Sequence, residues 1–179
     1  MKSIYGRLKK FTDAKPLPIL IHGDKMSTEL YGVTERIVNP RLARIKMTME
    51  TLKLSAANSG SYSLSANQLG ISNAIFVMHK ELLDSQSEAF KEKRFLHPRA
   101  FQVQEETPFP DTENDKLSLA DSQLLDPNDF RFFLNPRVLS ETKHQIVDWE
   151  YCLSFPSIRC MVKRPQAITV NYLDEEGAE

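Results

Sequence analysis

The sequence predicts an α+β fold in which mostly antiparallel β-sheets pack on helices. Three observations predict it. One segment, at residues 40–56, has helical apolar spacing, and several short apolar segments elsewhere are separated by turn residues. Neither an internal repeat nor a phosphate-binding glycine loop is present in the sequence. With 179 residues and 41% hydrophobic content, the chain can hold one domain with a sizeable core.

The composition excludes several classes of function. A formal net charge of −1 gives no basic field, so direct nucleic-acid binding is not expected. No apolar run approaches the roughly 18–20 residues that span a bilayer, and no secretory signal is present, so no membrane is expected. Cys152 and Cys160 form neither a C-x-x-C pair nor a zinc knuckle. They might bridge on adjacent strands, but free thiols in a reduced compartment are favoured.

Residues 1–14 are predicted to lie outside the domain, which we place at 15–179. This first segment is rich in bases and hydroxyl groups, and its first acid is Asp13. Such a composition suits either a short organelle transit peptide or a basic tail. The predicted location is accordingly an organelle of mitochondrial or plastid type, or the cytoplasm.

The first elements are a strand and a helix. Residues 16–21 form an apolar segment that indicates a short strand, and the turn at 22–24 follows it. Asn39 is expected to cap a helix that has Pro40 at its first position and ends at 58–60. Its apolar stripe recurs at steps of three and four residues and comprises Leu42, Ile45, Met49, Leu52 and Ala56.

A tight polar loop at 60–70 and a buried strand at 74–78 are expected next. The one long polar side chain of the loop is that of Gln68, which either satisfies backbone groups or serves a site. The segment at about 80–129 is either a functional lid or a solvated acidic insertion, of which the insertion is favoured, and a short helix is expected at 82–90. Between 105 and 129 it carries eight acids against a single base, Lys116.

The C-terminal part is predicted to consist of strands. They are expected at 130–134, 137–140, 145–154, 157–162 and 167–172, with turns at Asn135-Pro136 and at 174–177. On a strand at 149–154, Glu150 and Cys152 share one face. From the residues alone, Cys152 is a metal ligand, a nucleophile or a buried small side chain. None of the histidines His22, His79, His97 and His144 lies at ligand spacing.

Two ordered motifs resemble those of peptide deformylases. Glu150-Tyr-Cys-Leu-Ser154 is similar to the family's E-G-C-L-S motif, and the segment 61–68, Ser-Tyr-Ser-Leu-Ser-Ala-Asn-Gln, is similar to G-x-G-L-[AS]-A-x-Q. Leu134-Asn-Pro136 resembles the family's I-N-P strand end, and Pro18-Ile-Leu resembles its first strand. The resemblance covers about 15–177 and leaves the acidic insertion unmatched.

The resemblance implies a function and a role for each matching residue. The enzyme removes the formyl group from N-terminal formylmethionine of nascent peptides, possibly at the ribosome, with water activated by a divalent metal, iron or zinc. Cys152 is the implied metal ligand, and Gln68 with the Leu153 N–H is implied to hold the formyl oxygen. Glu150 is implied to pair with Arg164. The residues implied to line the substrate peptide are Tyr62, Ser63, Leu64 and Tyr151.

Three departures from the family pattern bear on catalysis. Ser61 and Ser63 replace motif glycines, and Tyr151 replaces the glycine of E-G-C-L-S. The family's H-E-x-x-H motif, which supplies two histidine ligands and the glutamate that handles protons, does not occur in the sequence. We therefore expect a fragment of a longer protein or an incomplete gene product, which lacks the metal-binding helix. The alternative is a non-catalytic deformylase-like module that binds peptides or partners.

Overall fold

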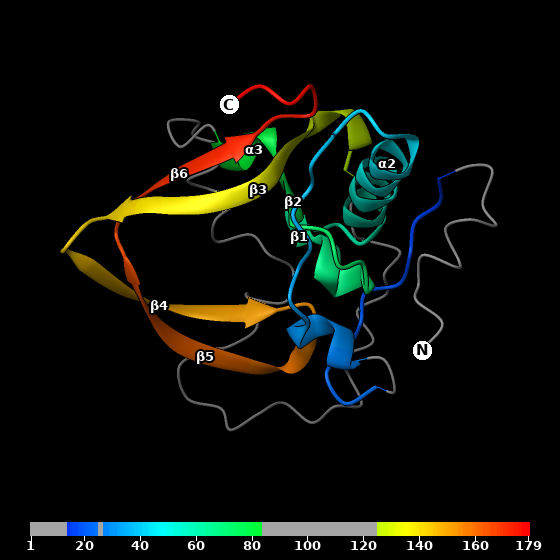
Figure 1. Ribbon diagram of the computed structural model, residues 1–179. Helices are drawn as coiled ribbons and strands as arrows, with labels where there is room; N and C mark the ends of the chain where they lie inside the picture. Colours follow the sequence, from blue (N-terminus) through cyan, green and yellow to red (C-terminus); the bar gives the residue numbers. More distant parts are fainter. Residues whose placement is uncertain (1–13, 25–26, 84–124) are drawn as a thin grey trace.

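The computed structural model describes residues 14–24, 27–83 and 125–179. One long helix, α2, and six strands are joined by short helical turns (Figure 1). The elements are η1 (Ser27–Tyr31), α2 (Ala43–Asn58), β1 (Ser63–Ser65), η2 (Ala66–Leu69), β2 (Ile75–His79), α3 (Lys80–Leu83), η4 (Pro127–Asp129), β3 (Phe130–Glu141), β4 (Gln145–Cys152), β5 (Phe155–Pro165) and β6 (Ile168–Leu173).

The strands form two sheets, and within each sheet all neighbouring strands are antiparallel. One sheet has four strands in the order β1-β2-β3-β6, and the other is the β4–β5 hairpin. Figure 1 shows the hairpin lying apart from β3 and β6, to which it is joined only at their ends. The predicted α+β fold with mostly antiparallel sheet is confirmed.

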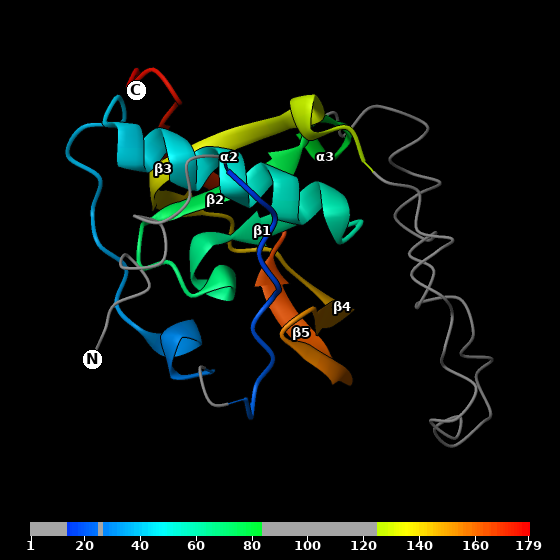
Figure 2. The same ribbon diagram turned by 90° about the vertical axis from the view of Figure 1, so that its right-hand side faces the viewer.

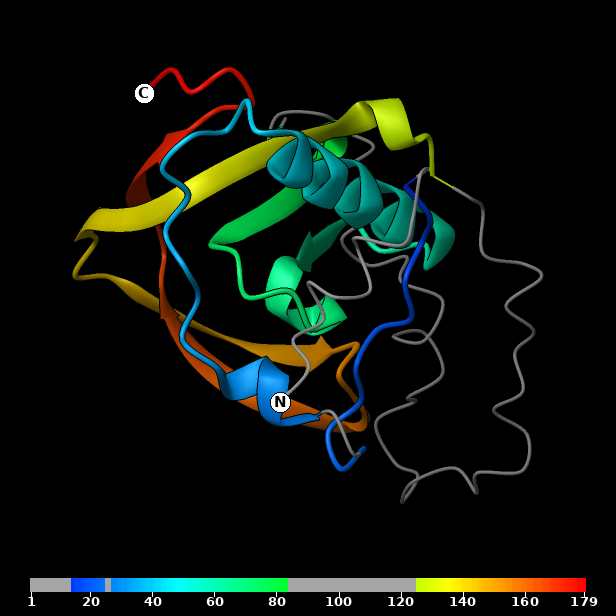
Figure 3. The same ribbon diagram turned by 45° about the vertical axis from the view of Figure 1, so that its right-hand side comes forward.

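Helix α2 covers one face of the four-stranded sheet (Figures 2 and 3). The core between them contains Leu52, Leu64, Val77 and Leu134, which are at most 2% exposed. Burial of one such side chain contributes about 1.5–3 kcal/mol. This packing fixes the positions of β1 and η2, the elements that carry Gln68 and its neighbours.

The predicted helix is confirmed in its interior and at its end, but its start is wrong. The helix begins at Ala43, because Asn39 instead closes a turn in which its side-chain oxygen accepts the Arg41 N–H at 2.9 Å. The end at Asn58 agrees with the prediction, and Gly60 follows with a φ of 62°. Four of the five predicted stripe residues are buried, whereas Leu42 is 41% exposed.

The predicted strand at 16–21 is absent, because this segment forms no hydrogen-bonded ladder. Its N–H groups donate instead to acceptors on three different elements: Leu17 to Ser55 Oγ, Leu20 to the Gln68 carbonyl and His22 to the Ser154 carbonyl, each at 2.8 Å. Figure 3 shows this coil running from the end of α2 to the turn of the β4–β5 hairpin.

Two further predictions of local structure are corrected. The loop predicted at 60–70 contains a short strand, β1, and a helical turn, η2. The predicted turn at Asn135-Pro136 is a bulge, through which β3 continues without ending. Asn135 has a φ of 51°, and its side chain accepts the Ile37 N–H at 2.7 Å and donates to the Ile37 carbonyl at 2.8 Å. The bulge also accommodates Pro136, which has no N–H to donate to a ladder.

Some predictions fall largely outside the described residues. They concern the segment 1–14, most of the acidic insertion and most of the helix predicted at 82–90. Of that helix, the structure describes only the part that falls in α3. Within the described ranges, no helix has the length and apolar character needed to cross a membrane.

Candidate functional site

Cys152 of β4 lies next to Gln68 of η2, the helical turn that follows β1. Cys152 is exposed at the end of β4, and the Nε2 atom of Gln68 lies 3.7 Å from its Sγ atom. The two residues are 84 positions apart in the sequence and come from the two motifs. The structure therefore brings together one side chain from each motif.

The position of Gln68 follows from a capping box on η2. Its Oε1 atom accepts hydrogen bonds from the backbone N–H and the hydroxyl of Ser65, each at 3.0 Å. With Oε1 held in this way, the amide nitrogen is directed toward the thiol. The amide of Gln68 thus satisfies a backbone group of Ser65 at one end and contacts the Cys152 thiol at the other.

Glu150 and Arg164 form a two-point ion pair on the hairpin. Arg164 donates from Nε to one carboxylate oxygen of Glu150 and from Nη2 to the other, the second at 2.7 Å. The hydrogen bond from Arg164 lowers the pKa of Glu150, and the same bond raises the pKa of Arg164. The side chains are 38% and 61% exposed, so solvent screens the pair and its net contribution is under about 1 kcal/mol.

The segment matching the substrate-lining motif lies at a sheet edge. Strand β1 pairs with β2 and with no other strand of the described sheets, so its outer edge is open. Leu64 is buried in the core and Ser63 is exposed. The carbonyl of Tyr62 accepts the His79 N–H at 2.8 Å, and the two rings meet edge to face at 5.2 Å.

The serines that replace motif glycines fit this edge without strain. Among the described residues other than glycine, Asn135 alone has a positive φ, so neither Ser61 nor Ser63 needs a glycine conformation. Ser61 is 9% exposed, and its hydroxyl donates to the Ser63 carbonyl at 2.6 Å. The Ser61 hydroxyl therefore already engages the carbonyl of Ser63 on this strand.

Leu153 lies in the two-residue turn between β4 and β5, next to Cys152. Its side chain packs against the core, while the following residue, Ser154, is 1% exposed. Tyr151 lies in β4 opposite Arg159. The turn thus holds the Leu153 backbone on the same hairpin end as the thiol.

A histidine that the sequence did not assign to the site packs on this turn. The ring of His22 stacks on Phe155 at 4.9 Å, and its Nδ1 atom lies 2.7 Å from the Tyr31 hydroxyl. The sequence predicts His22 only as a turn residue, and no spacing in the sequence links it to Phe155. This contact depends on the path of the coil at 14–24.

The described residues do not form a metal site on their own. No group of three or more His, Cys, Asp or Glu side chains in the described ranges is placed to hold a metal ion. Cys152 and Cys160 are both free thiols. A catalytic zinc site has about three protein ligands, so Cys152 alone would not form one. His97 lies outside the described residues.

The fold and this arrangement define an α+β domain of the peptide deformylase type, with two antiparallel sheets and a cysteine–glutamine pair between them. The chain belongs to the polypeptide deformylase family, whose model matches residues 16–179.

Individual relatives agree with this family. The peptide deformylase of Rhizobium meliloti is 47% identical over 47 residues, which are 26% of this chain and 27% of that protein. The match to this curated relative thus spans about a quarter of its length.

Solved structures share the fold at low identity. A peptide deformylase from Ehrlichia chaffeensis matches with a TM-score of 0.57 and 22% identity, over 91% of this chain and 71% of that one. A class I type b peptide deformylase from Acinetobacter baumannii, solved with Met-Ala-Ser bound, has a TM-score of 0.56 and 16% identity, over 92% and 80% of the two chains.

Proposed function

We propose that this chain provides the formyl-oxygen-binding and peptide-aligning parts of a peptide deformylase site. The observation that carries the proposal is the 3.7 Å approach of Gln68 Nε2 to Cys152 Sγ, in a chain of that family. The reaction is hydrolysis of an N-terminal formyl group. Water oxygen bonds to the formyl carbon, the C–N bond breaks, the amine receives a proton and formate leaves.

Gln68 and Leu153 would act on the formyl oxygen. The Nε2 group of Gln68 and the backbone N–H of Leu153 are the two proposed donors to this oxygen as it gains negative charge. Because η2 and the hairpin turn already hold both groups, little reorganisation is needed during the reaction. Removal of one such donor typically slows a reaction about 100- to 1,000-fold.

The peptide would lie along the open edge of β1. An extended peptide adds to a free strand edge through main-chain hydrogen bonds, and side-chain pockets then give specificity. Ser63 is exposed on this strand, and a peptide bound there would share the Ser63 carbonyl with the Ser61 hydroxyl or displace it. The Met-Ala-Ser complex of the Acinetobacter baumannii protein, which shares the fold, supports a peptide as the ligand.

Cys152 would be one ligand of a divalent metal, iron or zinc. When bound, such a metal acts as a Lewis acid and lowers the pKa of its bound water. The described residues hold no further ligands around Cys152, so metal binding requires the histidines that the family places in its H-E-x-x-H segment. Glu150, through its ion pair with Arg164, would hold the hairpin end that carries the thiol.

The decisive experiment compares the 179-residue chain with a version to which the Q-H-E-x-D-H helix of a relative has been added at the C-terminus. Both are loaded anaerobically with Fe(II) and given formyl-Met-Ala-Ser, and formate release is measured. We expect the extended chain to release formate. The 179-residue chain should bind the peptide and release no formate. Gln68→Ala in the extended chain should reduce release about 100-fold or more.

The matched control is Cys160→Ser, which removes the other free thiol and should leave formate release unchanged. If Cys152→Ser also leaves it unchanged, the proposed ligand role is wrong. If the extended chain binds the peptide and never releases formate, the non-catalytic peptide-binding module replaces the enzyme.

The location of the protein is a separate proposal. We propose that residues 1–14 direct it to a mitochondrion or plastid-like organelle, on the basis of their basic, hydroxyl-rich composition. Fusion of residues 1–14 to a fluorescent protein tests this directly, and uniform cytoplasmic fluorescence would contradict it.

A further inference from the structure

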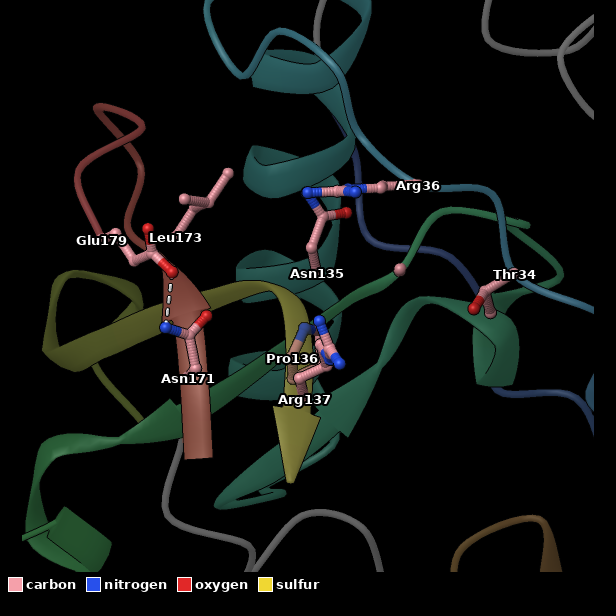
Figure 4. A pocket seen from close by; sticks show the side chains of 9 residues that line it. Thr34, Arg36, Asn135, Pro136, Arg137, Asn171, Leu173 and Glu179 are labelled. Atoms are coloured by element: carbon pink, nitrogen blue, oxygen red, sulfur yellow. Dashed lines mark hydrogen bonds between the residues drawn. The ribbon is translucent and has the colours of Figure 1, made fainter. Parts of the chain in front are cut away.

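A cavity of about 320 Å³ lies apart from the proposed deformylase site. Its walls come from the coil at 34–36, Ala74 before β2, the bulge of β3, strand β6 and Glu179 (Figure 4). Leu173, in one wall, packs against the core beneath α2. Neither Gln68 nor Cys152 contributes to its lining. Its volume falls near the lower end of the range for small-molecule sites, roughly 300–1,000 Å³.

Two exposed guanidinium groups line this cavity. Arg36 comes from the coil and Arg137 from β3, and Figure 4 shows both side chains at the cavity. Neither has an ion pair or a side-chain hydrogen bond with any residue in the described ranges. Two like charges at one small cavity repel each other, and a bound anion would relieve that repulsion.

The β3 bulge holds the two arginines at the same cavity. The two hydrogen bonds between the Asn135 side chain and the backbone of Ile37 tie the bulge to the coil, at 2.7 and 2.8 Å. Ile37 directly follows Arg36, and Arg137 lies two residues beyond Asn135. The register shift between Leu134 and Arg137 is the kind of irregularity that redirects a side chain. The backbone segments that carry the two arginines are therefore tied together before any ligand arrives.

The opposite wall already accommodates a carboxylate. Asn171 Nδ2 donates to Oε1 of Glu179 at 2.6 Å, within the lining of the cavity. Two guanidinium groups and one carboxylate leave a single net positive charge. Guanidinium groups match the planar edges of carboxylates and the oxygens of phosphates with paired hydrogen bonds.

We propose that this cavity is a binding site for a small oxyanion, a carboxylate or a phosphate, held by Arg36 and Arg137. The site lies outside the proposed deformylase function and does not depend on it. The limited volume favours a free small molecule over a macromolecule.

The test is titration of the folded chain with inorganic phosphate and, separately, with succinate in low-chloride buffer, followed by NMR. Arg36→Gln and Arg137→Gln remove one guanidinium each from exposed positions, so the fold should survive, as circular dichroism would check. Arg44→Gln is the matched control, because Arg44 is an exposed arginine on α2 outside the cavity.

We expect saturable binding of one or both anions, with shifts centred on Asn135 and Asn171. Affinity should fall roughly tenfold or more in each cavity variant, stay unchanged in Arg44→Gln and weaken with added salt. Cys152→Ser should bind the anion normally even if it abolishes all deformylase activity. The proposal is overturned if neither anion binds saturably, or if the Arg36→Gln/Arg137→Gln double variant binds as the wild type does.

Discussion

At the scale of single residues, Gln68 carries two separable roles on its two amide ends. Its Oε1 atom accepts from Ser65, which supports η2, and its Nε2 atom faces Cys152. Substitution by glutamate keeps an oxygen acceptor for Ser65 and removes the N–H donor. Substitution by alanine removes both. The pair of variants therefore distinguishes structural support from a role in the site.

We expect Gln68→Ala to lower the free energy of unfolding by about 1 kcal/mol, the usual contribution of a cap. Gln68→Glu should stay within about 0.5 kcal/mol of the wild type, because the contact with Ser65 remains. Urea unfolding measures both. In the chain extended by the histidine-bearing helix, both variants should lose formate release. Equal stability of the two variants would contradict the separation of roles.

The Glu150–Arg164 pair makes stability depend on pH in a defined direction. The pKa of Glu150 is lowered by its hydrogen bond with Arg164. A carboxyl group whose pKa is lowered by folding stabilises the fold at pH values above its ordinary pKa, about 4. This contribution is lost as the pH falls through the pKa of the group in the folded state. At neutral pH the pair is fully formed.

Glu150→Gln should therefore lower the free energy of unfolding at pH 7 by less than about 1 kcal/mol, and the difference from wild type should shrink as the pH falls through the folded-state pKa of Glu150. Urea unfolding at a series of pH values gives this difference directly. Arg164→Gln is the control, since adding it to Glu150→Gln should cause little further loss. A difference that grows toward low pH would contradict the sign of the effect.

At the scale of elements, the coil at 17–22 links the two halves of the candidate site. Leu20 donates to the carbonyl of Gln68, and His22 donates to the carbonyl of Ser154, each at 2.8 Å. The His22 ring also stacks on Phe155 and contacts the Tyr31 hydroxyl. One segment of chain thus connects η2, which bears Gln68, to the turn that bears Leu153.

We predict that His22→Ala loosens the hairpin turn, because the ring contacts with Phe155 and Tyr31 are lost. Amide hydrogen exchange at 153–155 should become faster, while exchange in α2 stays unchanged. Tyr31→Phe is the matched control: it keeps the edge-to-face ring contact and removes the hydroxyl, so its effect should be smaller. Unchanged exchange at 153–155 in His22→Ala would show that the coil does not hold the turn.

The elements also show how far the sequence predicts this fold. The interior of α2 is predicted well, because its buried positions repeat at helical spacing. The strand at 16–21 fails because Leu17 and Ile19 are apolar for packing against the core, not for pairing in a sheet. Asn135-Pro136 suits a turn and a bulge equally, and the contact with Ile37 that decides between them is distant in sequence.

The candidate site is predicted only in part, for a similar reason. The approach of Gln68 to Cys152 cannot be derived from spacing, and only resemblance to a known family suggested that the two residues act together. The sequence gives no indication that His22 stacks on Phe155 or that Arg36 and Arg137 line one cavity. Each of these arrangements depends on how a coil crosses a sheet, and periodicity carries no information about that path.

At the scale of the whole molecule, stability is unevenly distributed between the two sheets. The four-stranded sheet is covered by α2, whereas β4 and β5 contact chiefly each other. Large apolar side chains of the hairpin are exposed, among them Val147, Trp149 and Met161 at 53–62%. In the four-stranded sheet, Ile168 is also 53% exposed. An isolated two-stranded hairpin is marginally stable in water.

We therefore predict that the hairpin opens locally well before the molecule unfolds. Hydrogen exchange should be fast for β4 and β5 amides and slow for the β2–β3 pairs, whose exchange needs global unfolding. Leu52→Ala should lower the free energy of unfolding by about 2–5 kcal/mol and accelerate β2–β3 exchange by the corresponding factor. Trp149→Ala, at an exposed position, should leave β2–β3 exchange unchanged. Equal protection of the two sheets would mean that the molecule unfolds as one cooperative unit, and that the exposed hairpin is held more firmly than its contacts indicate.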